Sequence, residues 1–595
     1  MATYKAPLRD MRVVVNEVLD IGTISSLPKF GEVTPDLVDA VLEEAAKICE
    51  QVLFPINRSG DEEGCTFENG VVRTPAGFKE AYRTFVEGGW TNLSTDPQFG
   101  GQGLPATVGF VVEEMICSAN LAFGMYPGLS HGAYEAIRHH ANDDIRQTYL
   151  TKLGEGTWSG TMCLTEPHCG TDLGMLRTRA EPAADGSYRI TGTKIFISAG
   201  EHDLTENIIH LVLARLPDAP GGTKGISLFV VPKFLPDAGG KPGKRNGLAC
   251  GAIEHKMGIK ASSTCVMNFD GAQGWLVGEA NKGLNAMFTM MNAARLGVGM
   301  QGLGLAETAY QSAVAYARER LQGRSLSGPK TPDKPADPII VHPDVRRMLL
   351  TQKSFSEGAR ALAYWVGMLI DVARHSDDAG KREEADDLLQ LLTPVVKAYF
   401  TDSGFEAANL AVQVHGGHGY IREHGVEQLV RDARITMLYE GANGIQALDL
   451  VGRKLPMHGG RPMQKMLALL HGFVAENKGD AAMAEFVGPL EKAVNQMQGA
   501  VMWLMQNAMR NHEEAGGAAT DFLKIMALTV MAYMWSRIAK SALAGKANGG
   551  DDGFYDAKLA TGRFFIKRIL PQADAAYSAL QSGVEPMMAL KAEAF

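Results

Sequence analysis

The sequence lacks the features that mark several large classes of protein. It has only seven cysteines among 595 residues, an odd number without a CxxC pair, which argues against a disulfide framework and a structural zinc site. It has no long run of lysine or arginine, and its formal net charge is −9, whereas proteins that bind nucleic acid are usually basic. We therefore expect no nucleic-acid partner and no metal, and we expect a reducing compartment.

Long apolar segments are also missing. The first ten residues contain no hydrophobic stretch of the kind found in a signal peptide, so we expect no secretion signal there. The most apolar stretch, 522–535, is too short for a membrane span and contains Lys524, and we interpret it as a buried helix. We expect a cytoplasmic protein without a membrane span.

The hydrophobic pattern changes along the chain. Apolar residues recur at helical spacing from about 35 to 155, behind the start signal Thr34-Pro35. From about 160, short β-rich segments alternate with glycine- and proline-rich breaks and predict a small antiparallel β domain. Helical periodicity returns at 283 and predicts two long helices, at 344–375 and 384–415. The glycine-rich segment 292–306 indicates close backbone packing or a nearby ligand.

These changes predict an α+β fold in five parts, within the three to five domains that the length suggests. The parts are an N-terminal extension (1–34), an N-terminal helical domain (35–158), a middle antiparallel β domain (159–279), a C-terminal helical bundle (280–455) and an additional C-terminal helical domain (465–595).

Four segments combine residue types that suit a ligand site. They are CLTEPHCGTD at 163–172, GTKIFIS at 192–198, QVHGGHGY at 413–420 and RDARITMLYEGANGIQ at 431–446. Each segment has an ordinary interpretation when taken alone: a turn, a core strand, a helix C-cap and a loop carboxylate in water. The glycines at 416–419 follow a helix, so they do not form a Rossmann fingerprint, which needs a strand before the glycine-rich turn.

As a set, in this order and spacing, the four segments resemble the acyl-CoA dehydrogenase family over about residues 35–455. The resemblance implies the fold of that family, FAD as the cofactor and an acyl-CoA thioester as the substrate. The opening residues 4–7 and the extra C-terminal region resemble a longer bacterial subgroup. That subgroup contains fatty-acyl-CoA dehydrogenases and 3-methylmercaptopropionyl-CoA dehydrogenases.

The resemblance assigns Glu440 as the catalytic base. A thioester α-proton is weakly acidic, so its base must be a desolvated carboxylate with a raised pKa. By resemblance, the Glu440 backbone N–H and a ribityl hydroxyl of FAD hydrogen-bond the developing enolate oxygen, and the β-hydride passes to the flavin. Some family members instead place a glutamate just before the residue that matches Arg295. Here that position is Ala294, which leaves Glu440 as the candidate.

The resemblance also implies further contacts. Arg320 would pair with the FAD phosphates, and Gln413 with the glycine turn would contact FAD from the neighbouring subunit. Strand alternation would place Phe196 and Ser198 on one face, beside the flavin ring. The residues implied in FAD binding are Met162, Leu164, Thr165, Phe196, Ser198, Arg320, Gln413, Gly416, Gly417 and Asn443. Those implied in substrate binding are Thr171, Asn292, Arg295, Tyr439 and Gly441. Where the family commonly has threonine two residues after the base, this chain has Ala442, and Asn443 is the candidate substitute.

We expect oxidation of a medium- to long-chain fatty acyl-CoA to trans-2-enoyl-CoA in β-oxidation, with electrons passed to electron-transfer flavoprotein, by a homodimer. Three alternatives remain open. The substrate is 3-methylmercaptopropionyl-CoA, or the protein is an acyl-CoA oxidase that uses oxygen, or it is a non-catalytic scaffold of the same fold. Hydrogen peroxide formation would identify the oxidase, and a colourless purified protein would identify the scaffold.

Overall fold

The structure, a computed structural model, describes residues 2–550 and 553–595. The chain folds into two compact units, each assembled from segments that lie far apart in the sequence. The helical unit comprises Met1–Ala46, Pro105–Ser118 and Val298–Phe595, and the mixed unit comprises Lys47–Leu104 and Ala119–Gly297. The five domain boundaries expected from the sequence stay predictions.

The mixed unit contains a seven-stranded sheet. Its strands are β3 (Trp158–Cys163), β4 (Arg179–Pro182), β5 (Tyr188–Ser198), β6 (Asn207–Arg215), β7 (Ile226–Pro232), β10 (Leu248–Ile253) and β11 (Thr264–Val277). Because β7 pairs with both β6 and β11, the path β11-β5-β4-β6-β7 closes on itself. The expected β domain is present, but its sheet is mixed rather than purely antiparallel, since β3 and β4 each pair with β6 in parallel.

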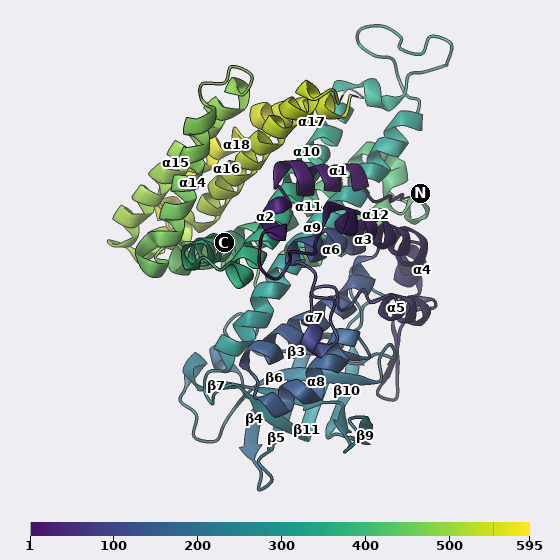
Figure 1. Ribbon diagram of the computed structural model, residues 1–595, viewed down its shortest axis with the longest axis vertical. Helices are drawn as coiled ribbons and strands as arrows, with labels where there is room; N and C mark the ends of the chain where they lie inside the picture. Colours follow the sequence, from purple (N-terminus) through teal and green to yellow (C-terminus); the bar gives the residue numbers. More distant parts are fainter. Residues whose placement is uncertain (1, 551–552) are drawn as a thin grey trace. The chain divides into compact units, whose positions relative to one another are not determined.

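Helices and two short hairpins complete the mixed unit. The helices are α4 (Pro55–Glu63), α5 (Phe78–Glu87), α7 (Leu121–His140) and α8 (Asp143–Glu155), and the hairpins are β1 (Thr66–Glu68) with β2 (Val71–Arg73) and β8 (Phe234–Pro236) with β9 (Pro242–Arg245). The first hairpin interrupts a region that the sequence pattern predicted to be helical throughout. Helices α7 and α8 pack against β3, as Figure 1 shows, and bury Trp158 of that strand in an apolar core.

The helical unit contains the long helices of the chain. Its helices are α1 (Leu8–Val13), α2 (Gly22–Ser25), α10 (Pro343–His375), α11 (Ala379–His415), α12 (Val426–Arg434), α13 (Asn443–Asp449), α14 (Arg461–Asn477), α15 (Ala484–Ala508), α16 (His512–Ala547), α17 (Phe554–Phe564), α18 (Gln572–Gln581) and α19 (Glu585–Met588). Three more helices begin in one unit and end in the other: α3 (Pro35–Ile48), α6 (Ala106–Ala119) and α9 (Gly283–Glu319).

The glycines of α9 allow close packing between helix backbones. A Cβ atom on Gly302 would lie 2.4 Å from the Phe400 carbonyl oxygen on α11, and one on Gly299 would lie 2.6 Å from Val396 Cγ1. On Gly304 it would lie 2.7 Å from Cys117 Cβ on α6. The first of the two explanations for the glycine-rich segment, close backbone packing, is therefore confirmed.

The apolar stretch 522–535 is the middle of a much longer helix, α16. Among the described residues, α16 is the one helix long and apolar enough to cross a membrane by length and composition. However, 89% of its most apolar 18-residue window is buried inside the protein. It packs beside α15 and α18, as Figure 1 shows, so we interpret α16 as a core helix of the helical unit.

A buried ionic cluster, which we call the Arg360 network, joins five helices of the helical unit. Arg360 of α10 is 1% exposed and pairs with Glu114 of α6 (2.6 Å) and Glu307 of α9 (2.9 Å). It also pairs with Asp10 of α1, to which Lys558 of α17 donates a second charge-assisted hydrogen bond. The N-terminal extension and the C-terminal helices therefore meet at a single set of opposite charges.

Candidate active site

One buried carboxylate, Glu166, holds the loop that follows β3 in the mixed unit. It accepts hydrogen bonds from the backbone N–H groups of Arg177 (2.7 Å) and Thr178 (3.0 Å), and it pairs with the buried Lys194 of β5 at 2.9 Å. The Lys194 ammonium also donates to the Leu164 carbonyl at 3.0 Å. Burial alone would raise the pKa of Glu166, but Lys194 and the hydrogen bonds outweigh it and lower the pKa to about 2. An ionised pair therefore fixes the loop to β5.

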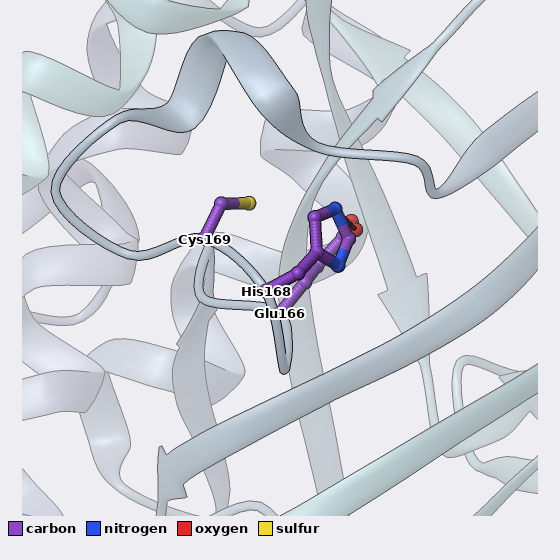
Figure 2. A group of neighbouring side chains, drawn as sticks. All are labelled: Glu166, His168 and Cys169. Carbon is purple, nitrogen blue, oxygen red and sulfur yellow. Dashed lines mark ion pairs between the residues drawn. The ribbon is translucent and has the colours of Figure 1, made fainter.

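Glu166, His168 and Cys169 lie close enough to suggest a metal site, and Figure 2 shows the imidazole beside the carboxylate while the thiol lies apart from both. The chemistry of the trio opposes that interpretation. Lys194 already neutralises Glu166, and His168 Nε2 lies 2.9 Å from the Met175 carbonyl oxygen, which requires a proton on that nitrogen. Burial raises the pKa of the Cys169 thiol, which disfavours the thiolate that metals bind. We interpret the trio as part of the loop anchor.

A β-bulge in β5 presents Phe196 beside this loop. Ile197 lies opposite Cys265 and Lys194 lies opposite Met267, so β5 has one more residue than β11 between these pairs. Phe196, in the bulge, has a φ of +58° and a side chain that is 59% exposed. The neighbouring Ile195 N–H donates to the Thr165 carbonyl at 2.9 Å. The bulge interrupts the regular pairing of β5, and the common face expected for Phe196 and Ser198 stays a prediction.

The predicted flavin contacts of the mixed unit lie on these connected segments. Thr165 and Ser198 are partly exposed, and neither hydroxyl hydrogen-bonds another group among residues 2–550 and 553–595. Met162 is partly buried in β3, whereas the Leu164 side chain belongs to the apolar core, so any cofactor contact of Leu164 would involve its backbone. Two available hydroxyls beside an exposed aromatic ring fit the polar edge and the ring of a flavin.

The predicted CoA contacts of the mixed unit lie on two elements. Thr171 is exposed in the loop anchored by Glu166. Asn292 and Arg295 lie on α9, where Asn292 is partly buried and Arg295 is 4% exposed. Ala294 stands at the alternative base position on the same helix, so no carboxylate is available there.

In the helical unit, Glu440 lies in a strained loop. Its φ is +57° and that of Gly441 is +89°, and the left-handed region is unfavourable for a residue with a Cβ atom. Gln446 Nε2 donates to the carbonyl oxygens of both residues, at 3.1 Å each. The Lys397 ammonium donates to the Gly441 carbonyl at 2.9 Å. Strained residues persist where their surroundings over-determine them, which is common at functional sites.

The two residues that flank this pair differ, because a side-chain hydrogen bond holds Tyr439 and none caps the helix at Ala442. The Tyr439 hydroxyl donates to Gln301 Oε1 of α9, and burial, followed by the charge effects of Cys117 and Glu440, raises the pKa of Tyr439 well above its usual value. Ala442 is the N-cap of α13 and makes no side-chain capping bond.

Asn443 is held by α11. Its side-chain amide bonds to that helix through both its oxygen and its nitrogen, and its contact with a cofactor stays a prediction.

A third group of predicted residues lies where α9 and α11 end. Tyr316 of α9 stacks on His415 of α11 with ring centroids 4.3 Å apart, and its hydroxyl is 2.7 Å from His418 Nδ1. These contacts bring the two helix ends together. The predicted FAD contacts here, all exposed, are Arg320, Gln413, Gly416 and Gly417. An exposed guanidinium and the exposed backbone of a glycine turn both suit a phosphate group.

Sequence reasoning missed several residues that hold these groups in place. The missed residues are Glu166, Lys194, Gln301, Lys397 and Gln446. A signal was present for the two lysines, because each stands in an otherwise apolar stretch: Lys194 before IFI and Lys397 in PVVKAYF. A lysine is rarely buried without a partner, so such a position indicates a specific polar contact.

Family models match four consecutive parts of the chain. They are "Acyl-CoA dehydrogenase, N-terminal domain" at 36–157, "Acyl-CoA dehydrogenase, middle domain" at 161–272, "Acyl-CoA dehydrogenase, C-terminal domain" at 281–455 and "Acetyl-CoA dehydrogenase C-terminal like" at 464–591.

Full-length relatives and a solved structure are also similar to this chain. It is 43% identical over 577 residues to the 3-methylmercaptopropionyl-CoA dehydrogenase of Ruegeria pomeroyi, covering 97% of each chain. It is 35% identical to a butyryl-CoA dehydrogenase of Syntrophomonas wolfei, covering 100% of this chain and 99% of that one. The solved structure of Caenorhabditis elegans ACDH-11 in complex with C11-CoA has a TM-score of 0.79 at 18% identity, covering 99% of this chain and 95% of that one, which shows a shared fold.

Proposed function

Because the chain belongs to the acyl-CoA dehydrogenase family, we propose that it oxidises the Cα–Cβ bond of an acyl-CoA thioester, with Glu440 as the base. The protein is an oxidoreductase of this family and its cofactor is FAD. The observation that supports Glu440 best is the loop itself. A carboxylate-bearing residue is kept in a left-handed conformation by hydrogen bonds to the two carbonyl groups around it.

In the proposed reaction, Glu440 takes the α-proton and the β-carbon loses a hydride, which leaves a trans double bond between them. Bound FAD would supply the oxidation by accepting the hydride. The residues of this chain would hold and orient the cofactor and the substrate. Thr165 and Ser198 offer hydroxyls to the flavin, Phe196 offers an aromatic face, and Arg320 offers a guanidinium to its phosphates. The fixed loop presents the Glu440 carboxylate at a defined place, which is the main contribution a base of this kind needs.

We propose a short acyl chain, with 3-methylmercaptopropionyl-CoA as the first candidate substrate. The relative of that name is 43% identical across 97% of both chains, and the butyryl-CoA dehydrogenase is 35% identical across its length. These two names support a short substrate over the medium- to long-chain substrate expected from the sequence. A linear short-chain acyl-CoA is the second candidate.

The test is anaerobic flavin bleaching by butyryl-, pentanoyl-, 3-methylmercaptopropionyl-, octanoyl- and palmitoyl-CoA. Pentanoyl-CoA has the heavy-atom count of 3-methylmercaptopropionyl-CoA, with a methylene in place of sulfur, so the pair separates thioether recognition from chain length. We expect the thioether substrate to give the highest ratio of bleaching rate constant to apparent Kd. Faster bleaching by octanoyl- or palmitoyl-CoA would contradict the short-chain proposal.

The role of Glu440 is tested with Glu440→Gln. This variant should retain FAD and bind acyl-CoA but bleach the flavin roughly 10³-fold more slowly, because the amide cannot accept the proton. Glu427→Gln is the matched control, since Glu427 pairs with Arg431 on α12 and should leave the rate unchanged. Bleaching of Glu440→Gln at the wild-type rate would disprove the assignment.

We propose electron-transfer flavoprotein as the electron acceptor, in line with the family resemblance. The oxidase alternative predicts rapid hydrogen peroxide formation from acyl-CoA without any other acceptor, and such a result would replace the proposal. The scaffold alternative is disfavoured by the presence of Glu440, and a purified protein without a flavin spectrum would restore it.

We also propose that the protein is a homodimer of the bacterial cytoplasm. The exposed Arg320, Gln413, Gly416 and Gly417 support a shared cofactor site at which a second copy meets the ends of α9 and α11. Sedimentation equilibrium of the wild type and of Gly417→Trp tests this. Loss of both dimer and flavin in the variant is expected, and a monomeric wild type that keeps its flavin would refute it.

A further inference from the structure

Lys397 is a buried charge that the proposed chemistry does not use. It lies in the middle of α11 with no exposed surface. Its ammonium donates to the Gly441 carbonyl oxygen at 2.9 Å and to Asn443 Oδ1 at 2.8 Å. Both acceptors lie within three residues of Glu440. A buried ammonium is costly unless its hydrogen bonds are made, so at least two of its three donors are committed to the loop of the base.

Asn443 connects the same loop to α11 a second time. Its side-chain nitrogen, with two hydrogens to donate, lies within hydrogen-bonding distance of the Thr401 hydroxyl (2.9 Å), the Ala398 carbonyl (3.2 Å) and Asp402 Oδ1 (2.7 Å). Thr401 and Ala398 lie one helical turn or less from Lys397. The side chain of Asn443 therefore spans the surface of α11 around Lys397 and places its oxygen on the ammonium.

These contacts oppose the relaxation that the loop would otherwise favour. A residue with a Cβ atom leaves the left-handed region when its surroundings permit, and release of Glu440 requires rotation about its own N–Cα bond, which carries the following residues with it. That rotation would turn the Gly441 carbonyl away from Lys397. Gln446 also holds this carbonyl, but at the longer distance of 3.1 Å and through one amide shared between two acceptors.

The exit from the loop has no side-chain cap. Ala442 is the N-cap of α13 and has no side-chain oxygen for the first turn of that helix, and no side-chain capping bond is made there. Lys397 and Asn443 therefore provide, from a neighbouring helix, the constraint that a capping side chain would provide within the loop.

We propose that Lys397 is a positioning residue for Glu440, acting through the Gly441 carbonyl and Asn443 to keep the base in its strained conformation. This inference rests on the proposed function, since it concerns the placement of the proposed base. It assigns Lys397 no contact with substrate or cofactor.

The experiment compares four variants of the full-length holoprotein with the wild type. Lys397→Met removes the donors but keeps the length of the side chain, and Lys397→Arg keeps charge and donors. Asn443→Ala removes the second connection and one acceptor of the Lys397 ammonium, but it leaves the hydrogen bond from Lys397 to the Gly441 carbonyl. Lys353→Met is the matched control, because Lys353 is a partly buried lysine of α10 that pairs with Glu357 and does not contact the loop. Each is assayed by anaerobic flavin bleaching with 3-methylmercaptopropionyl-CoA and butyryl-CoA, and by hydrogen exchange of the peptide spanning 436–446.

We expect Lys397→Met to bleach the flavin roughly 100-fold more slowly at saturating substrate, with an apparent Kd within about threefold of wild type, because misplacement of a base affects the chemical step. The amides of 436–446 should exchange at least tenfold faster, and Lys397→Arg should recover most of the rate. Asn443→Ala should show the same pattern to a smaller degree, and Lys353→Met should match the wild type in both assays.

Wild-type bleaching and wild-type exchange in a folded Lys397→Met would overturn the inference. A slow variant that Lys397→Arg does not rescue, or whose loop exchanges normally, would also overturn it. If Lys397→Met does not fold, the inference is tested by the bleaching rate and the hydrogen exchange of Asn443→Ala. Failure of the proposed function would give a different result. The flavin of the wild type would not bleach with any acyl-CoA, or that of Glu440→Gln would bleach at the wild-type rate. Either result is independent of how fast the amides of 436–446 exchange.

Discussion

Replacement of Arg360 by methionine should cost the helical unit about 4 kcal/mol of stability near neutral pH. The side chain is 1% exposed and pairs with Glu114 at 2.6 Å, with Glu307 at 2.9 Å and with Asp10. Methionine fills much of the same volume but leaves buried carboxylates without that partner. Removing one member of a buried ion pair costs roughly 3–5 kcal/mol, because the remaining charge stays desolvated. The loss is a large part of the roughly 5–15 kcal/mol by which proteins are stable.

The penalty should depend on pH in a defined direction. In the wild type, burial alone would raise the pKa of Asp10, but Lys558 and Arg360 prevail and lower it from 3.8 to about 2. The stability that Asp10 contributes is therefore present above its unfolded value and lost as the pH falls towards 2. In Arg360→Met, Glu114 loses its cation and Asp10 keeps only Lys558, so the folded-state pKa values of these two carboxylates rise and the folded variant binds protons more readily than the folded wild type. The difference between variant and wild type should then shrink as the pH is lowered from neutrality to about 5.

Urea unfolding followed by circular dichroism, at several pH values, measures both effects. Arg347→Met is the matched control, because Arg347 lies on the same helix in an exposed pair with Asp344 at 2.7 Å and should change the stability by less than about 0.5 kcal/mol. A loss below about 1 kcal/mol in Arg360→Met near neutral pH would refute the reasoning. So would a penalty that stays constant as the pH falls.

Two further substitutions test local packing and capping. Ala442→Thr should stabilise the protein by about 1 kcal/mol, because a hydroxyl at this N-cap can accept a bond from the first turn of α13, and an unchanged thermal midpoint would contradict this. Gly302→Ala should destabilise it by about 1–3 kcal/mol, since the new Cβ would lie 2.4 Å from the Phe400 carbonyl oxygen. Gly472→Ala in α14 has open space around it and should be neutral or stabilising by up to about 1 kcal/mol, so equal effects of the two alanines would refute the packing argument.

The long helices were predictable because their signal is local. Helices expected at 344–375 and 384–415 are α10 (Pro343–His375) and α11 (Ala379–His415). The buried helix expected at 522–535 is the centre of α16, whose ends were missed because the apolar run stops before the helix does. Periodicity over many residues identifies such elements, whereas their ends depend on caps and neighbours.

The sheet was predicted in part, and its direction of pairing was not. Alternation identified β5, but nothing in the pattern of a strand states whether its neighbour runs parallel, as β3 and β6 do. The bulge that carries Phe196 was missed for the same reason, since it arises from the mismatch between β5 and β11. The additional β1–β2 hairpin is made of strands too short to give a periodic signal.

By itself the sequence determined the family and the order of helical and β-rich regions, and it led us to propose Glu440 rather than position 294 as the base, because these follow from which residues occur and in what order. Only the tertiary structure decided what holds that base. The partners of the loop, Lys397, Gln301 and Gln446, lie on three different helices, and their contacts exist only once those helices pack. It also decided that the side-chain amide of Asn443 bonds to α11, because such an amide bonds to the groups that folding brings within about 3 Å of it.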